Sequence, residues 1–293
     1  MAGGILGGLG FELTGQFEDC EDPAVPDTEP ASQDAPPVAV RARSLGLDGP
    51  RGPVYDDVDL SAPAGTLLVV SGPAGTGRTS LLLTLAGRMR ATRGEAEVAG
   101  HALPGGRGAV QRQVVLATVR GVNDLDGELT VEEHVLERLA LAAPWWRLLT
   151  PSPRDVPAVL AAVDDDEHPP VEPAALVRDV SAYDRFRLGV ALALADRARL
   201  HPRVLVADDV DDLRDPHAVT AAWRLLGVLA GSDDGPVPGG LTVLASCSAP
   251  SSLPADVRTD PRTLLHPLTT RRPAPSTATP AADPDDAKDE AHR

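Results

Sequence analysis

The fold of this chain is indicated first by Gly72-Pro73-Ala74-Gly75-Thr76-Gly77-Arg78-Thr79. This stretch follows the phosphate-loop pattern G-x-x-x-x-G-K-[ST] at every fixed position except one, where Arg78 replaces lysine. Residues 66–70 (TLLVV) before it predict a buried strand, and residues 80–88 after it have a helical pattern. A strand, a glycine-rich turn and a helix in this order predict a loop that wraps the phosphates of a nucleotide.

Each residue type in this loop has a physical role in holding phosphate. Glycine allows the tight wrapping that turns successive backbone N–H groups inward, and the following helix adds the positive end of its dipole. The Thr79 hydroxyl would bind Mg²⁺, whereas the guanidinium of Arg78 is a bulkier, planar replacement for an ammonium group. The alternative is a glycine-rich turn that holds no ligand. The expected phosphate contacts are Gly72, Pro73, Ala74, Gly75, Thr76, Gly77, Arg78, Thr79 and Ser80.

A second candidate element ends in two carboxylates. Residues 204–207 (VLVA) form another apolar run typical of a buried strand, and Asp208 and Asp209 follow it directly. We expect Asp208 to hold Mg²⁺ and Asp209 to be the catalytic residue that orients an attacking water as a general base. The alternative is that these acids only cap the turn of residues 208–212 (DDVDD).

Short β-rich runs alternate with helical patterns in the middle of the chain, which predicts an α/β domain. The predicted strands also include residues 38–42 and 54–60 of an edge sheet and residues 95–98, 114–117 and 241–245, and the predicted helices include 131–143, 184–200 and 218–229. Both ends of the chain lack apolar periodicity and cannot bury enough apolar surface to fold alone. We predict a disordered acidic arm at residues 1–37, a folded domain at 38–268 with a helical subdomain at about 129–200, and a disordered tail at 269–293.

Composition excludes several classes of function. A net charge of −16 argues against binding to nucleic acid, which carries the same sign of charge. The only cysteines, Cys20 and Cys247, make neither a disulfide framework nor a metal site, which fits a reducing cytoplasm, and the seven histidines lack metal-ligand spacing. No apolar run approaches the ~20 residues of a membrane span, so we expect no direct insertion. The single lysine, Lys288, disfavours a lysine-dependent kinase core.

Taken in order, these segments resemble the ATP-binding cassette of ABC transporters over residues 38–268. Residues 81–87 (LLLTLAG) look like the helix after the family's phosphate loop, and residues 92–100 (TRGEAEVAG) look like its T-x-G-E strand. Residues 129–134 (LTVEEH) are similar to its entry into the helical subdomain, and residues 185–195 to the helix after its signature motif. The resemblance implies a P-loop NTPase with a mixed sheet core, an antiparallel edge sheet and a helical subdomain.

Several positions depart from the family's pattern. Val180-Ser181-Ala182-Tyr183-Asp184 stands where the family has L-S-G-G-Q, and Asp209 stands where it has glutamate. The Q-loop glutamine falls near Gly121, and the switch histidine falls at Ser248, or at Cys247 if the register differs by one. No aromatic residue stands at the adenine-stacking position near Leu47, and Tyr55 is the nearest substitute. These departures fall at positions that, in the family, contact the γ-phosphate, the partner cassette or the base. Such a pattern is expected of a degenerate member, a pseudo-ATPase.

The resemblance implies an ATP-binding subunit that binds Mg·ATP in the cytoplasm. It would form a homo- or heterodimer of cassettes and work with an integral membrane permease-like partner, with ATP hydrolysis weak or dependent on a partner subunit. A non-catalytic scaffold or regulatory binding protein on the same fold is the second interpretation. A small-molecule kinase is disfavoured by the position of the helical insertion. The apolar patch of Trp145, Trp146, Leu148 and Leu149 would either pack in the core or dock against such a permease.

Overall fold

The computed structural model describes residues 37–142, 151–195, 202–231 and 240–269. The acidic arm, the C-terminal tail and the Trp145–Trp146 patch of the sequence analysis lie outside these residues. No helix within the described ranges is long and apolar enough to cross a membrane.

Four strands between Val38 and Leu103 form an antiparallel sheet. Its four strands lie in the order β2-β1-β4-β5. The strands are β1 (Val38–Gly49), β2 (Gly52–Pro63), β4 (Arg93–Val98) and β5 (His101–Leu103). Ala42 on β1 pairs with Leu60 on β2 and with Ala96 on β4, so β1 lies between these two strands.

The second sheet is parallel and carries the phosphate loop. Its five strands lie in the order β6-β7-β8-β3-β9, and all four neighbouring pairs are parallel. The strands are β3 (Leu67–Ser71), β6 (Val114–Thr118), β7 (Val204–Ala207), β8 (Thr242–Cys247) and β9 (Thr263–Pro267). Because parallel strands end at the same edge, the loops after β3, β7 and β8 are neighbours although 175 residues separate the first and last of these strands.

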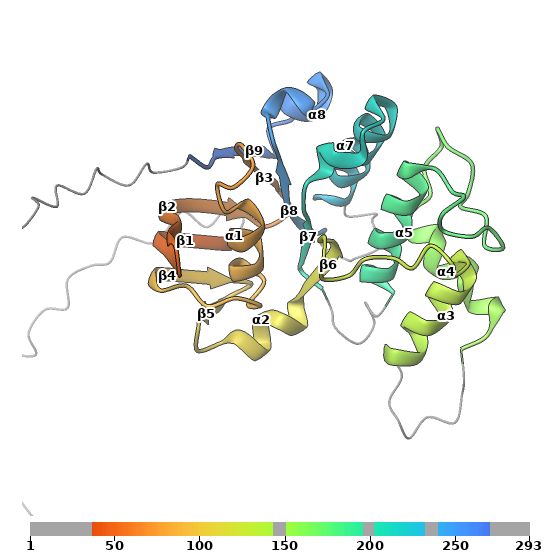
Figure 1. Ribbon diagram of the computed structural model, residues 1–293, viewed down its shortest axis with the longest axis horizontal. Coiled ribbons are helices and arrows are strands. Elements are labelled where there is room, and N and C mark those ends of the chain that lie inside the picture. The colour runs from red at the N-terminus through yellow and green to blue at the C-terminus, as the bar shows by residue number, and fades with distance from the viewer. Residues whose placement is uncertain (1–36, 143–150, 196–201, 232–239, 270–293) are drawn as a thin grey trace, which may run out of the picture. The chain divides into compact units, whose positions relative to one another are not determined.

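Helices cover both faces of the parallel sheet (Figure 1). The helix α1 (Arg78–Leu85) follows the phosphate loop, and α2 (Arg107–Gln113) leads into β6. The helical subdomain holds α3 (Val131–Ala142), α4 (Val156–Leu160) and α5 (Ala182–Leu194). The helix α7 (Pro216–Leu229) lies between β7 and β8 in the chain, and α8 (Ala255–Thr259) precedes β9. Four short 3₁₀ segments complete the described elements: Pro153–Asp155, Ala161–Val163, Val210–Leu213 and Pro250–Ser252.

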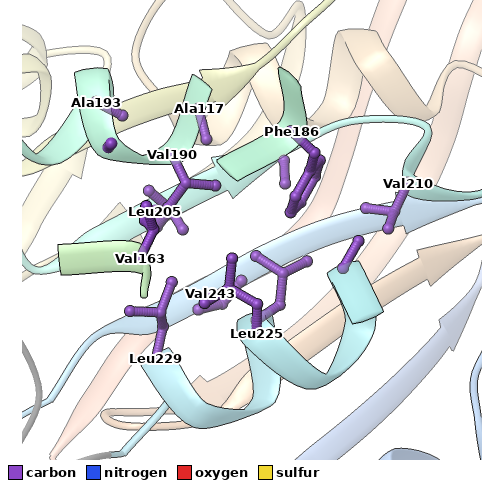
Figure 2. Packing of buried hydrophobic residues seen from close by; sticks show 14 of the residues in the cluster. Ala117, Val163, Phe186, Val190, Ala193, Leu205, Val210, Leu225, Leu229 and Val243 are labelled. Carbon is purple, nitrogen blue, oxygen red and sulfur yellow. The ribbon is translucent and has the colours of Figure 1, made fainter. Parts of the chain in front are cut away.

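The parallel sheet separates two hydrophobic cores. Along β3, Leu68 and Val70 pack with α1 and the antiparallel sheet, whereas Leu67 and Val69 belong to the core of α5 and α7. Figure 2 shows side chains of α5 and α7, such as Val190 and Leu225, converging on Leu205 of β7 and Val243 of β8. A strand that is apolar at every position therefore serves two cores, as a strand buried on both faces must.

The predicted α/β architecture is confirmed: the chain has parallel and antiparallel strands and a group of helices between β6 and β7. The two strand directions are segregated into separate sheets. Sequence analysis did not predict β5, β9, α2, α4 or α8, because these segments, of three to seven residues, are too short to show a clear period.

Candidate functional site

The phosphate loop lies between the end of β3 and the start of α1. Gly75 and Gly77 both have positive φ angles, of 82° and 88°. The first backbone bond of α1 joins the N–H of Leu81 to the carbonyl of Gly77 at 2.8 Å. The N–H groups of Arg78, Thr79 and Ser80 precede that bond, so none of them has an acceptor within the helix. These groups form a cradle suited to phosphate oxygens.

Two glycines of the loop, Gly72 and Gly77, leave no room for a side chain, because backbone atoms of other segments lie close to them. A Cβ atom on Gly72 would lie 2.3 Å from the carbonyl oxygen of Leu268, which follows β9. A Cβ atom on Gly77 would lie 2.6 Å from the carbonyl oxygen of Val54 on β2. The loop is thus fitted between the start of β2 and the residue after β9, and larger residues at either glycine would displace it.

Thr79 and Asp208 meet at the centre of the site. The Thr79 hydroxyl donates to Oδ2 of Asp208 at 2.5 Å, although 129 residues separate them in the chain. Asp208 is buried, and its other oxygen, Oδ1, accepts a short hydrogen bond from the hydroxyl of Ser246 at the end of β8. A hydroxyl and a carboxylate are oxygen ligands of the kind Mg²⁺ prefers, so this pair fits the predicted metal site.

Arg78 makes an ion pair with Asp209. Its Nη2 lies 2.7 Å from Oδ1 of Asp209, and the Arg78 side chain is 9% exposed while that of Asp209 is 38% exposed. The other guanidinium nitrogen, Nη1, is buried without a hydrogen-bond partner among the described residues. Arg78 is therefore paired with Asp209, the residue predicted to be the general base. The Nη1 atom of Arg78 still lacks an acceptor among the described residues.

The backbone of Asp209 turns sharply. Its φ and ψ angles, 47° and 50°, are left-handed, which is uncommon for residues other than glycine but tolerated by aspartate. The N–H of Asp209 donates to the hydroxyl of Ser246 at 2.9 Å. Burial raises the pKa of the Asp209 carboxyl above its ordinary value, the neighbouring Asp208 carboxylate raises it further, and Arg78 partly offsets both.

Ser246 is a site residue that sequence analysis missed. Its hydroxyl contacts both the carboxylate of Asp208 and the backbone of Asp209, and its side chain is fully buried. The only signal in the sequence is a small polar residue near the end of an otherwise apolar strand, residues 242–247 (TVLASC).

The two candidates for the switch position, Ser248 and Cys247, differ in their surroundings. Ser248 is exposed, and both its N–H and its hydroxyl donate to Oδ2 of Asp211 in the turn after β7. Cys247 is completely buried, and burial raises the pKa of its thiol to about 11. Of the two registers left open by the sequence, the one with Ser248 places a side chain beside the carboxylates of that turn.

A cavity of about 550 Å³ adjoins the carboxylates. Asp208, Asp209 and Asp212 line it together with residues of the β6 end and of α5. Arg120 also lines this cavity and makes an ion pair with Asp212. Gly121, at the expected Q-loop position, is exposed and donates its N–H to Asp124 at 2.9 Å, so no side chain extends from it toward the site.

The predicted signature segment is bonded to its own subdomain. Ser181 caps α5 by accepting from the N–H of Asp184 at 3.0 Å. Tyr183 is buried, with 5% of its surface exposed, and its hydroxyl donates to Asp165 at 2.6 Å. The guanidinium of the buried Arg187 lies 5.0 Å from the centre of the Tyr183 ring. Tyr183 thus points into the helical subdomain instead of adding bulk to the surface before α5.

A larger cavity, of about 750 Å³, lies away from the phosphate loop. Residues 164–168, Tyr183 and the outer side of α7 and α8 line it. None of the residues predicted to hold nucleotide or metal lines it. The chemistry that the sequence predicts is therefore at the smaller cavity and the phosphate loop.

Tyr55 is not available to a base. Its side chain is 3% exposed, and its hydroxyl donates to Thr84 of α1 at 2.7 Å. Leu47, at the predicted stacking position, is also buried, at 7%. Across the described residues no group of three or more histidine, cysteine, aspartate and glutamate side chains is arranged to hold a further metal ion.

Comparison with known proteins gives one consistent family. The model of the ABC transporter family matches residues 55–210. The chain is 31% identical over 232 residues to a probable anion import ATP-binding protein of Haloferax volcanii, an alignment that covers 71% of this chain and 74% of that protein. It is 25% identical over 198 residues to the Nod factor export ATP-binding protein I of Neorhizobium galegae, covering 68% and 53% of the two chains.

Solved structures with the same fold are ABC cassettes. A bacterial ABC transporter cassette solved as a dimer aligns with a TM-score of 0.57 and 16% identity, over 79% of this chain and 97% of that one. The cbiO1 protein of Clostridium perfringens, part of an ABC transporter complex, aligns with a TM-score of 0.56 and 15% identity, over 73% and 79% of the two chains. At these identities the likeness concerns the fold alone.

Proposed function

This chain belongs to the ABC transporter family as an ATP-binding subunit, and on that basis we propose that residues 72–80 hold the phosphates of Mg·ATP. The observation that carries the proposal is the contact between Thr79 and Asp208 at the edge of the parallel sheet. It brings an oxygen pair suited to Mg²⁺ to the N-terminus of α1, where the backbone N–H groups are without helical partners.

Each residue has a separate task in this proposal. The backbone of residues 72–80 and the Arg78 guanidinium bind and orient the phosphates, while Thr79 and Asp208 hold Mg²⁺. The bound ion would neutralise charge on the phosphate oxygens. Ser246 fixes the Asp208 carboxylate through its hydroxyl and the Asp209 backbone through the same oxygen. Asp209 accepts a proton from, or orients, the attacking water.

Hydrolysis by the chain alone is expected to be weak. Arg78 is paired with Asp209, so a phosphate group that binds Arg78 must compete with that carboxylate. Until the pair opens, Asp209 is turned toward the guanidinium and is not free to orient water. Aspartate is also one methylene shorter than glutamate, and a displacement of about 1 Å can cost on the order of a hundredfold in rate.

A partner subunit is expected to supply what this chain lacks. Its relatives include import and export ATP-binding proteins, and one solved cassette of the same fold is a dimer. We infer that this chain pairs with a second cassette and works at the cytoplasmic face with an integral membrane permease-like partner. Because the N–H of Asp184 at the start of α5 is bonded to the Ser181 hydroxyl, which in turn donates to the Asp184 carboxylate, a heterodimer whose other member has an open signature segment suits this chain best.

The Arg78–Asp209 pair also favours a second candidate, a non-catalytic scaffold that keeps nucleotide as a structural ligand. The two candidates share the phosphate site and differ only in turnover.

The test is calorimetric titration of Mg·ATP into the native chain and an Arg78→Ala variant, with phosphate release followed in parallel. Saturable binding that the variant loses supports the phosphate site. Phosphate release that Asp209→Asn abolishes supports an ATPase, and binding without release supports the scaffold. No binding by the native chain at millimolar Mg·ATP contradicts the proposed site in this chain.

A further inference from the structure

We propose that the surface where the end of α1 meets the start of α2 binds an acidic segment of a partner protein, with one apolar side chain of that segment inserted into a small pocket. The inference does not depend on the nucleotide site, because none of the described residues that line the pocket belongs to residues 72–80 or 208–212. It rests on the shape and lining of the pocket and on a group of arginines around it.

The pocket has a volume of about 200 Å³. Strands β1, β4 and β5 supply Leu45, Ala96 and Leu103 to its lining, and Arg90 and Arg107 line it as well. No aspartate or glutamate is among the described residues that line it. Sites for small molecules usually have volumes of about 300 Å³ or more, so this pocket suits a single side chain better than a cofactor. Its apolar walls favour an apolar side chain.

Three arginines, Arg88, Arg90 and Arg107, gather at this surface. Burial and the nearby charge of Arg107 lower the pKa of the Arg88 guanidinium below its ordinary value, so these two cations repel each other. None of the three takes part in an ion pair among the described residues, whereas Arg93 on β4 pairs with two aspartates. In a chain of net charge −16, this local excess of positive charge is suited to an acidic partner.

The end of α1 accounts for one of these arginines but not for the other two. Nε of Arg107 and Nε2 of Gln111 both donate to the carbonyl of Gly87, at 2.8 and 2.7 Å. The backbone N–H of Arg88 donates to the carbonyl of Leu83 at 2.8 Å. These carbonyls therefore have donors without the guanidinium groups of the other two arginines, which are available to an external acceptor.

The pocket and the arginines together define the chemistry of the partner. A guanidinium group is planar and binds a carboxylate through two parallel hydrogen bonds. Met89 lines the pocket and is 37% exposed, and its flexible side chain can adapt to an incoming apolar group. The matching segment is an apolar residue flanked by glutamates or aspartates. Its apolar side chain fills the pocket, and its carboxylates bind Arg88 and Arg90.

The probe is a fluorescent peptide of sequence Glu-Glu-Leu-Glu-Glu, and its binding to the full chain is followed by fluorescence anisotropy. Arg90→Gln should weaken binding about tenfold, because it removes a charged hydrogen bond. Arg258→Gln removes an exposed arginine of α8 and should leave the affinity unchanged. A peptide with glycine in place of leucine should also bind about tenfold more weakly, because the pocket then stays empty. Equal affinities of the native chain and Arg90→Gln, equal affinities of the two peptides, or no binding at millimolar peptide would each overturn the proposal.

Two further measurements separate this surface from other sites for anions. Arg78→Ala should leave the affinity for the peptide unchanged, and a loss of binding in that variant would place the peptide at the phosphate loop and overturn the proposal. Sodium sulfate and sodium chloride of equal ionic strength should weaken the peptide equally, because both screen its charges. A stronger effect of sulfate would identify a site for free oxyanions and would also overturn the proposal. Because the peptide is titrated without nucleotide, failure of the proposed nucleotide site does not alter these outcomes.

Discussion

The end of the parallel sheet and the start of α5 are both places where polar groups gather at a helix N-terminus, but the groups face different ways. At the end of the sheet, Thr79, Asp208 and Ser246 come from three segments far apart in the chain and contact one another across the site. At the start of α5, Ser181 and Asp184 are bonded to each other and Tyr183 points inward to Asp165. The first arrangement leaves N–H groups of the loop and helix for a ligand, whereas the second uses its own side chains.

This contrast predicts that substitutions at the phosphate loop and at the start of α5 have independent effects. A phosphate loop is fixed by the fold, because its glycines are fitted against Val54 and Leu268. The start of α5 has no such constraint, since its side chains contribute equally well to the core of the helical subdomain. Substitutions in each region can show whether nucleotide affinity and the stability of the helical subdomain change independently.

Tyr183→Ala should destabilise the chain by about 3 kcal/mol without changing its affinity for Mg·ATP. The variant removes a buried ring, leaves Oδ2 of Asp165 without the Tyr183 donor and uncovers the guanidinium of Arg187. Urea unfolding measures the first effect and calorimetric titration the second. A parallel loss of nucleotide affinity in the folded variant would show that the two regions are coupled.

Gly77→Ala should weaken Mg·ATP binding on the order of 100-fold, about 2.7 kcal/mol. Its Cβ atom would meet the carbonyl of Val54 at 2.6 Å, in addition to the strain of a φ angle of 88°. Gly75→Ala is the matched control: its φ angle is 82°, but nothing lies within 4 Å of the added atom, so it carries only a backbone cost of about 1 kcal/mol. Titration of both variants checks the difference, and equal losses would contradict the role of Val54.

Asp209→Asn should strengthen Mg·ATP binding about fivefold, equivalent to roughly 1 kcal/mol. The substitution keeps the shape of the side chain but frees Arg78 from a competing carboxylate at 2.7 Å. Asp212→Asn removes the same charge from the cavity rim, where the pairing partner is Arg120, and should leave the affinity nearly unchanged. Weaker binding by the Asp209→Asn variant would show that the ion pair organises the site instead of closing it.

Asp165→Asn should reduce stability by about 1 kcal/mol at pH 7 and by less in acid. Burial raises the pKa of the Asp165 carboxyl, but hydrogen bonds from Tyr183 and His168 outweigh it, and the net pKa lies below the ordinary value. A carboxyl with a depressed pKa stabilises the fold above its ordinary pKa, and this contribution is lost as the pH falls through the folded value. The difference from the native chain should therefore diminish below about pH 4.

Urea unfolding over a range of pH measures this last effect. Asp166→Asn is its control, because Asp166 is an exposed neighbour in the same acidic run. A stability difference for Asp165→Asn that is the same at every pH would mean that shape, not charge, is what the position contributes.

The sequence predicted the elements that are defined by local patterns. The predicted strands at 66–70 and 204–207 correspond to β3 (Leu67–Ser71) and β7 (Val204–Ala207), because a continuous apolar run needs burial on both faces. The turn after β3 is fixed by its glycines. The network of the site was predicted only in part. Thr79 and Asp208 were named separately as metal ligands, and the structure brings them together.

The contacts that determine the behaviour of the site could not be predicted. The pairing of Arg78 with Asp209 joins residues 131 positions apart, and it depends on a left-handed turn at an aspartate that no local pattern requires. The inward orientation of Tyr183 depends on Asp165 and His168, which precede it in a proline-rich acidic segment with no periodicity. Such contacts are properties of the folded chain, because the sequence around one partner does not indicate the other.

The contact between Leu268 and the phosphate loop has a practical consequence for protein engineering. The N–H of Leu268 donates to the carbonyl of Ser71 at 2.6 Å, and its own carbonyl lies against Gly72. A truncation that ends before Leu268 would remove one wall of the loop, although it would delete no residue predicted to bind nucleotide. Purification tags and reporter fusions should therefore be joined at the N-terminus, or well beyond residue 269, to leave this wall intact.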